Sequence, residues 1–225
     1  MNKIAIFIFL ILVYLGLSKS FSPSEKKTLY ISNERVYGNY FKNAPIEVVL
    51  IDAFQIGFLI KTYFHKYKVI HGFKHPEETI IRVSKRFFER NEHHIGMSLF
   101  RRSEVKDNES NIPMYPGYLF VGDPAYGRWT LHDSGQKYWK FYRAYRLFPE
   151  HLHWGDFRPS KKFHKEAELA YESTRTFFGL NNEFGTKGEI SMAQLKRYEF
   201  KVDDVSLKKI INKHFGPIKK KIKRY

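Results

Sequence analysis

Residues 43–64 read NAPIEVVLIDAFQIGFLIKTYF, and the fold class depends most on how this segment is interpreted. Asn43 suits the N-cap of a helix and Pro45 suits its first turn. From Ile46 to Phe64 the residues are apolar on most of a helical circumference. At roughly 100° per residue, the polar side chains fall on one narrow stripe, made of Glu47, Asp52, Gln55 and Thr62. We therefore expect one helix buried against the body of the protein. A second membrane span is disfavoured because its carboxylates would lie in or near lipid at high cost.

Four other segments carry helix signals, namely residues 75–90, 134–148, 160–179 and 204–214. Acids in the first turn and bases in the last favour the first of them, and Ser134 and Ser160 are suitable caps for the second and third. Tyr30 to Phe41 is rich enough in β-branched and aromatic residues for a short irregular strand. The sequence thus predicts a helix-rich α+β protein, with short irregular strands and an aromatic, loop-rich second region.

The most polar part of the chain is Arg101 to Asn111, RRSEVKDNESN, which we interpret as a domain boundary. It separates a helical N-terminal region, 28–100, from an aromatic-rich region, 112–200. A basic helix and tail, 201–225, follows. With 225 residues and 43% hydrophobic content, the chain can bury one sizeable core or two small ones.

The N-terminus is an apolar run from Ile4 to Leu17 behind Lys3. Such a run is short for a bilayer span and has the length of a signal-peptide core. Ser18 and Ser20 are small residues at the positions that a signal peptidase reads, so cleavage after Ser20 is the preferred interpretation of residues 1–20. A retained membrane anchor and a buried helix are the alternatives. The charge rule does not orient an anchor, because basic residues lie on both flanks.

The chain has no cysteine, which excludes disulfides, zinc thiolate sites and thiol catalysis. Its formal net charge is +16, from 39 Lys and Arg against 23 Asp and Glu, and this favours polyanionic partners. Two groups of bases are candidate binding residues. The first lies on the solvent face of the predicted helix 134–148 and the second at the C-terminus; they are Lys137, Lys140, Arg143 and Arg146, and Lys208, Lys209, Lys213, Lys219, Lys220, Lys221, Lys223 and Arg224.

Histidines and acids gather in residues 150–156, EHLHWGD. His151 and His153 would lie on one face of a strand, with Asp156 as a third metal ligand. The His-Leu-His-aromatic string resembles the last metal motif of lysostaphin-like peptidoglycan endopeptidases. That family also needs an upstream His and Asp, and here His132 and Asp133 are adjacent, at the wrong spacing. We expect a structural loop, with no metal, no cofactor and no catalytic residue, and keep the metal set as the alternative.

Residues 115–191 carry a further pattern. It begins with Pro116-Gly117-Tyr118, continues through the turn Gly122 to Trp129 and the aromatic segment 134–145, and closes with Phe184-Gly185-Thr186. In this order of features the chain resembles small bacterial envelope proteins and lipoproteins. The resemblance implies a location and no activity. This chain lacks a lipobox cysteine, so it has no site for thioether lipid anchoring.

These observations predict a non-enzymatic protein, exported to or anchored in a bacterial cell envelope, with a structural or binding role. Its basic faces would dock on an anionic membrane surface, a wall polymer or an acidic protein partner. Nucleic acid is a poor match for a chain with a membrane-directed N-terminus. Two alternatives remain open: a metal-dependent cell-wall hydrolase centred on His151 and His153, and a membrane-anchored accessory subunit of an organellar inner-membrane complex.

Overall fold

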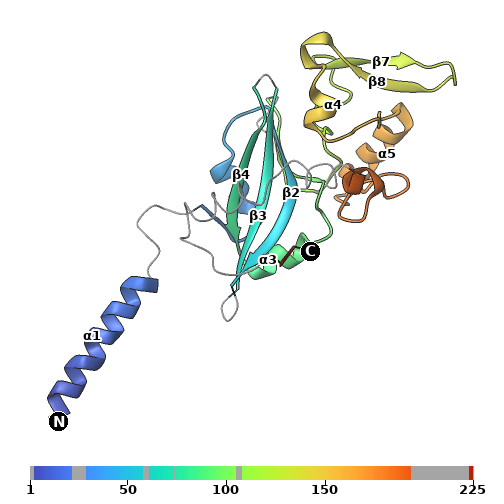
Figure 1. Cartoon of the computed structure of the whole chain (residues 1–225). Helices are drawn as coiled ribbons and strands as arrows, with labels where there is room; N and C mark the ends of the chain where they lie inside the picture. Colours follow the sequence, from blue (N-terminus) through green and yellow to red (C-terminus); the bar gives the residue numbers. More distant parts are fainter. Residues whose placement is uncertain are drawn as a thin grey trace.

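The computed structural model describes residues 3–21, 29–57, 61–72, 74–104, 108–193 and 223–224. Its main element is a curled, mixed sheet with the strand order β1-β4-β3-β2-β5-β6, and a second sheet pairs β7 with β8 (Figure 1). Strand accounts for 29% of the chain and helix for 28%. The prediction of a helix-rich protein is therefore wrong.

The segment predicted as one buried helix, Ile46 to Phe64, instead contains one central strand and the start of the strand beside it. β2 (Ile46–Ile56) and β3 (Thr62–His71) pair antiparallel, from Ile46 opposite His71 to Ile56 opposite Thr62. Eight of the eleven residues of β2 are buried, because both faces of the strand are covered. A strand of this kind shows no polar alternation, so its apolar run also fits a buried helix. The β-branched residues of IEVVLIDAFQI favour the strand.

The predicted helix 75–90 is also mostly strand. β4 (Glu77–Val83) pairs antiparallel with β3, and only the last part of the segment is helical, as α3 (Lys85–Arg90). The helix begins late because Ser84 is its N-cap and accepts a hydrogen bond from Phe87 N at 3.1 Å. Thr79, Ile80, Ile81 and Val83 give the preceding stretch its β propensity.

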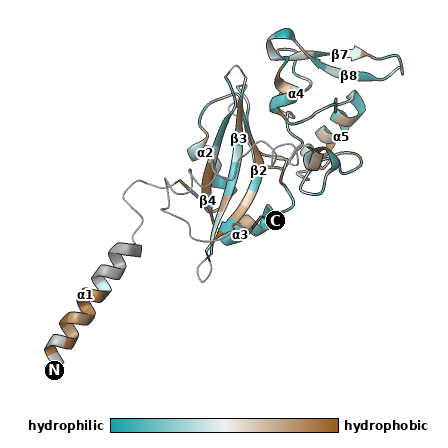
Figure 2. Ribbon diagram, in the orientation of Figure 1, coloured by the Kyte–Doolittle hydropathy of each residue, from teal (hydrophilic) through white to brown (hydrophobic). Residues whose placement is uncertain are grey.

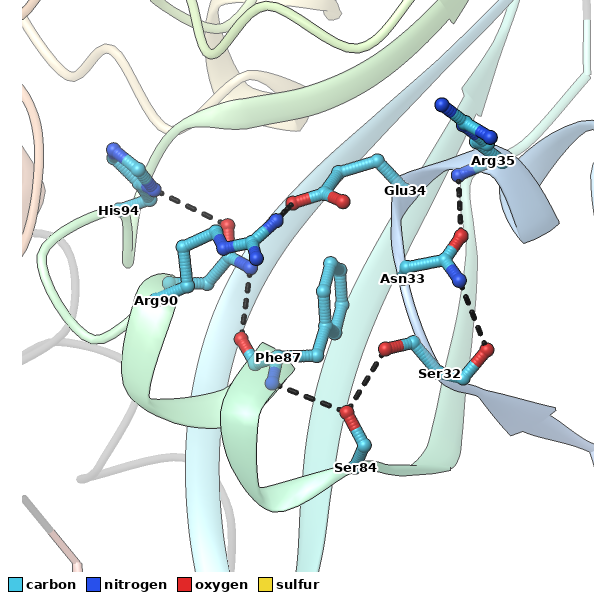
Figure 3. A network of polar contacts seen from close by, with 9 residues as sticks. Ser32, Asn33, Glu34, Arg35, Ser84, Phe87, Arg90 and His94 are labelled. Atoms are coloured by element: carbon cyan, nitrogen blue, oxygen red, sulfur yellow. Dashed lines mark hydrogen bonds and ion pairs between the residues drawn. The ribbon is translucent and has the colours of Figure 1, made fainter.

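Hydrogen bonds and an ion pair connect residues 30–36 to α3 and its N-cap (Figure 3). β1 (Tyr30–Ile31) pairs parallel with β4 and is followed by η1 (Glu34–Val36) and α2 (Tyr37–Tyr40), so the strand expected over 30–41 is only two residues long. Ser84 Oγ donates to Ser32 O at 2.9 Å, and Arg90 Nη1 bonds Glu34 Oε1 at 2.6 Å. These contacts hold β1 and η1 against the helix.

The polar segment 101–111 begins inside the sheet. β5 (Ser98–Arg102) pairs with β2, and β6 (Glu109–Ser110) pairs with β5. Arg101 and Arg102 are both buried, and Arg102 bonds Glu109 across the two strands. The placement of a domain boundary here stays a prediction.

Two hydrophobic cores occupy the two faces of the sheet. The first core draws on residues 31–100 and includes Tyr37, Tyr67 and Phe100. The second core is built mainly from residues 114–184, together with four side chains of the first region: Val49, Ile51, Ile70 and Met97. In β2, Val48 faces the first core and Val49 the second, as the twofold period of a strand requires. The sheet therefore belongs to both cores.

Residues 134–148, predicted as one helix, form the turn and the second strand of a β-hairpin, followed by short helical turns. β7 (Gly127–Leu131) pairs with β8 (Lys137–Phe141), and Gly135, with φ +78°, lies in the turn between them. η3 (Arg143–Tyr145) and α4 (Phe148–His151) follow, so α4 begins where the predicted helix was to end. The bases at 137, 140, 143 and 146 are three residues apart in sequence, but they do not share a helix face, because they lie in β8, in η3 and just after it.

α5 (Lys161–Glu172) confirms the helix expected after Ser160, whose side chain accepts from Phe163 N at 3.1 Å. The helix ends at Glu172, before the predicted Gly179. The helix expected over 204–214 lies outside the described residues. Of the basic tail, the structure describes only β9 (Lys223–Arg224), which pairs with β2 at Phe54 and Gln55.

The N-terminal segment forms α1 (Lys3–Phe21), and Figure 2 colours much of it as hydrophobic. Its described large apolar side chains are exposed, including Ile4 and Phe7. In the part of the chain that the structure describes, no helix has both the length and the apolar character to cross a membrane. Signal-peptide cleavage after Ser20 stays a prediction.

Candidate functional site

The outer face of the β7–β8 hairpin carries opposed cations. Arg128 and Lys140 are partners in the strand register, so their side chains leave the same face at a short distance from each other. Both are exposed, as is Lys137 near the turn. Like charges placed directly opposite each other destabilise a strand pair unless an anion or solvent lies between them. The hairpin thus presents positive charge that an anionic ligand would relieve.

The positive charge extends beyond the hairpin. Arg143 in η3 and Arg146 just after it are exposed, and Arg158 is exposed further along the chain. Among the described residues, none of the ion pairs involves any of these cations: Arg128, Lys137, Lys140, Arg143, Arg146 and Arg158. We call these six residues the basic hairpin set. The three acids within 127–160 are Asp133, Glu150 and Asp156.

A hollow of about 620 Å³ opens beside the hairpin. Residues 156–160 form its other wall, since they run next to β8: Trp139 N donates to Pro159 O at 3.0 Å, and Tyr138 pairs with Ser160. The lining residues are Thr130, Leu131, His132, Ser134, Tyr138, Trp139, Lys140, Asp156 and Arg158. The hollow therefore combines two cations, one carboxylate, three hydroxyls, an imidazole and aromatic rings.

The base of the hollow is rigid. Trp139 is 3% exposed, and its ring meets that of Trp129 edge to face, with centroids 5.1 Å apart. Its indole N–H is buried and has no hydrogen-bond partner among the described residues. On the other wall, Arg158 Nη1 donates to Gly155 O and Phe157 O at 2.8 and 2.6 Å, which fixes the guanidinium. The site is thus largely preformed.

The histidines of the predicted metal set lie apart from this hollow. His153 Nε2 is 3.0 Å from Lys68 Nζ of β3, while Asp156 lines the hollow with the hairpin. Within the described residues, no group of three or more His, Cys, Asp or Glu side chains is placed to hold a metal ion. His151 is half-buried, and burial together with Lys68 lowers its pKa. The structure therefore does not bring His151, His153 and Asp156 together as a ligand set.

Sequence reasoning missed a buried polar cluster between the sheet and the second core. Glu47 is fully buried in β2 and accepts a hydrogen bond from Gly117 N at 2.8 Å. Burial raises its pKa to about 7, against the opposing effect of Arg101. Arg101 donates to Ser98 Oγ at 3.1 Å and lies over the Tyr118 ring. A glutamate inside an apolar run was the available signal, but it was assigned to the polar stripe of a helix.

No protein-family model, curated protein or solved structure matches this chain. The resemblance of residues 115–191 to small envelope proteins therefore stays a prediction.

Proposed function

We propose that this chain is an exported, non-enzymatic binding protein whose β7–β8 hairpin and adjoining hollow hold an anionic wall polymer. The observation that carries the proposal is the basic hairpin set. These six exposed cations have no ion-pair partner among the described residues, and two of them, Lys140 and Arg158, line the hollow. Positive charge that no internal carboxylate neutralises is available to an anionic ligand.

A polymer with sugar or polyol units fits this surface better than a lipid headgroup layer or an acidic protein. The hollow has the volume of a small-molecule site, which would take one or two residues of a chain. Thr130, Ser134 and Asp156 can exchange hydrogen bonds with hydroxyl groups, and Tyr138 offers an aromatic face. The remaining cations lie outside the hollow, where the anionic groups of neighbouring units would pass.

The location of the protein belongs to the same proposal. The apolar N-terminal segment, with small residues at 18 and 20, favours export to a bacterial envelope, and anionic wall polymers are found there. Docking through the tail bases, Lys208 to Arg224, is a separate proposal, because most of that segment lies outside the described residues.

The test is a charge reversal with a matched control. The variant Lys140→Glu/Arg158→Glu changes both cations of the hollow, and Arg35→Glu/Lys42→Glu makes the same change of net charge at exposed sites near the other end of the chain. Binding is measured by calorimetry with polygalacturonate and poly(glycerol phosphate), with neutral dextran as a blank. We expect the hollow variant to bind at least about tenfold more weakly, a loss of about 1.4 kcal/mol, and the control to bind within about twofold of the unchanged protein.

Two results would contradict the proposal. If both variants lose affinity equally, the ligand responds to net charge and the hairpin is not its site. If dextran binds as well as the anionic polymers, charge does not carry recognition. Affinity should also weaken as salt rises from 0.05 to 0.5 M, since the Debye length falls below roughly 10 Å in that range.

A further inference from the structure

A lysine and a histidine from opposite sides of the second core meet at the sheet. Lys68 lies on β3, on the face that carries Ile70 into the second core, and its Nζ is 3.0 Å from Nε2 of His153. Both side chains are half-buried, so small molecules retain access to them. The pair is 85 residues apart in sequence and depends wholly on the fold.

The carboxylate expected to pair with Lys68 forms an ion pair with another lysine instead. Glu78 stands opposite Lys68 in the register of β3 and β4, yet its carboxylate bonds Lys66 Nζ at 2.7 Å. Among the described residues, no ion pair joins Lys68 to an acid. Burial lowers the pKa of Lys68, and Lys66 adds to this, while Glu78 and Glu150 act in the opposite direction.

His153 is held toward the lysine by its neighbours. Leu152 and Trp154, on either side of it, are almost completely buried, and Trp154 Nε1 donates to Pro116 O at 2.7 Å. His153 itself has φ +57°, in the left-handed region that non-glycine residues seldom adopt. This conformation costs energy and persists only where the surrounding structure enforces it. Residues that adopt it cluster at functional sites.

The imidazole is neutral and suited to accept a hydrogen bond. Burial lowers the pKa of His153 to about 3, and Lys68, His151 and Lys66 add to the effect. It is therefore neutral at pH 7. Because Lys68 offers only donors while it carries its proton, Nε2 of His153 is the acceptor in the contact. A partly desolvated amine with a second cation nearby, in hydrogen-bond reach of a fixed, neutral acceptor, is the arrangement of an activated lysine nucleophile.

We propose that Lys68 is a carbonyl-reactive amine that forms imines with small aldehydes or ketones, with His153 as its base. The lone pair of the neutral amine adds to the carbonyl carbon, and the carbonyl π electrons move to oxygen. Both protons of the amine nitrogen pass in turn through Nε2 of His153 to that oxygen, and the C–O bond breaks to release water as the C=N bond forms. No oxidant or reductant takes part. This activity does not depend on the polymer-binding function.

Reductive trapping on the full chain tests the proposal. Propanal is added at pH 7 with excess cyanoborohydride, so that imine formation limits the rate, and N-propylated lysines are located by peptide mass spectrometry. We expect Lys68 to be labelled at least about tenfold faster than the exposed Lys137 and Lys140. Its rate should also level off at a lower pH than theirs. Labelling of Lys68 at or below the rate of these exposed lysines would overturn the proposal.

The role of His153 is tested by a separate variant and its control. Asn tolerates the left-handed conformation but cannot accept the proton as imidazole does, so His153→Asn should keep the turn and slow trapping at Lys68 about tenfold. His93→Asn, at an exposed histidine, is the matched control and should label Lys68 at the original rate. Unchanged labelling in His153→Asn would refute the role of His153. If that variant does not fold, the pH profile of the unchanged protein decides: a Lys68 profile identical to those of exposed lysines counts against the proposal.

Discussion

Gly117 joins the sheet to the second core. Its N–H donates to Glu47 of β2, and its φ of +94° lies in the region that glycine adopts without strain. A Cβ at this position would lie 2.6 Å from Cζ2 of Trp154 and 2.8 Å from Cδ1 of Leu152, both of which are buried. One residue thus determines how closely the Pro116–Tyr118 turn approaches the core.

We predict that Gly117→Ala destabilises the protein by about 2–4 kcal/mol, because backbone strain adds to a clash with side chains that cannot move away. Gly135→Ala is the matched control. Gly135 also has positive φ, +78°, but a Cβ there meets nothing within 4 Å, so only the strain of about 1 kcal/mol applies. Urea unfolding of both variants measures the difference. If both variants lose the same free energy of unfolding, the clash of the new Cβ at residue 117 with Trp154 does not contribute to the loss.

At the scale of elements, local signals predicted some of the fold and misled elsewhere. Ser160 was identified correctly as a cap because its bond to Phe163 N involves only neighbouring residues. The strand β2 and the start of β3 were taken for a helix, since burial on both faces of β2 removes the alternation that identifies a strand. Lys137 and Lys140 of β8 are three residues apart, a spacing that also fits a helix. Gly135 indicated a turn before them and should have been given more weight.

We expect the two N-capping serines to contribute different amounts to the free energy of unfolding. Ser160→Ala removes one hydrogen bond, to Phe163 N, and should destabilise the protein by about 1 kcal/mol. Ser84→Ala removes the cap of α3 and also the bond to Ser32 O, so we expect about 1–2 kcal/mol (Figure 3). Hydrogen exchange should show faster opening of β1 in Ser84→Ala only. Faster exchange of β1 in both variants would contradict the tie between Ser84 and Ser32.

At the scale of the whole molecule, the sites depend on contacts that no local pattern contains. Lys68 meets His153, and Glu47 meets Gly117, across 85 and 70 residues of sequence. Lys137, Lys140, Arg143 and Arg146 were predicted as binding residues from charge alone, and all four are exposed in the structure. Arg128 and Arg158 were not selected, because their places beside Lys140 follow from strand pairing and not from helical spacing.

Buried histidines predict that the protein loses stability in acid. Burial lowers the pKa of His65 and His153 to about 3 and that of His94 and His164 to about 4. Below pH 6.5 the unfolded chain takes up protons at these sites and the folded chain does not, so the free energy of unfolding falls with pH. His65 and His164 alone should account for about 3 kcal/mol between pH 6.5 and 5, at up to about 1.4 kcal/mol per proton and pH unit.

Glu47 acts in the opposite direction. Its raised pKa means that the folded state binds a proton more readily, so its contribution to stability is present at low pH and is lost as pH rises through about 7. The decline in acid should therefore be steeper in Glu47→Gln than in the unchanged protein. Urea unfolding at pH 7.5, 6.5, 5.5 and 5 measures both slopes. A free energy of unfolding that stays constant from pH 6.5 to 5 would refute the account of the neutral histidines.

The most direct test of anionic-polymer binding at the hairpin is a hydrogen-exchange footprint on the unchanged protein. Exchange is compared with and without saturating polygalacturonate or poly(glycerol phosphate), at 0.05 M salt. We predict slower amide exchange in β7, β8 and residues 156–158, and no change in β3, β4 or α3. Protection confined to the sheet, or spread evenly over every basic segment, would contradict the assignment of the binding site to the β7–β8 hairpin.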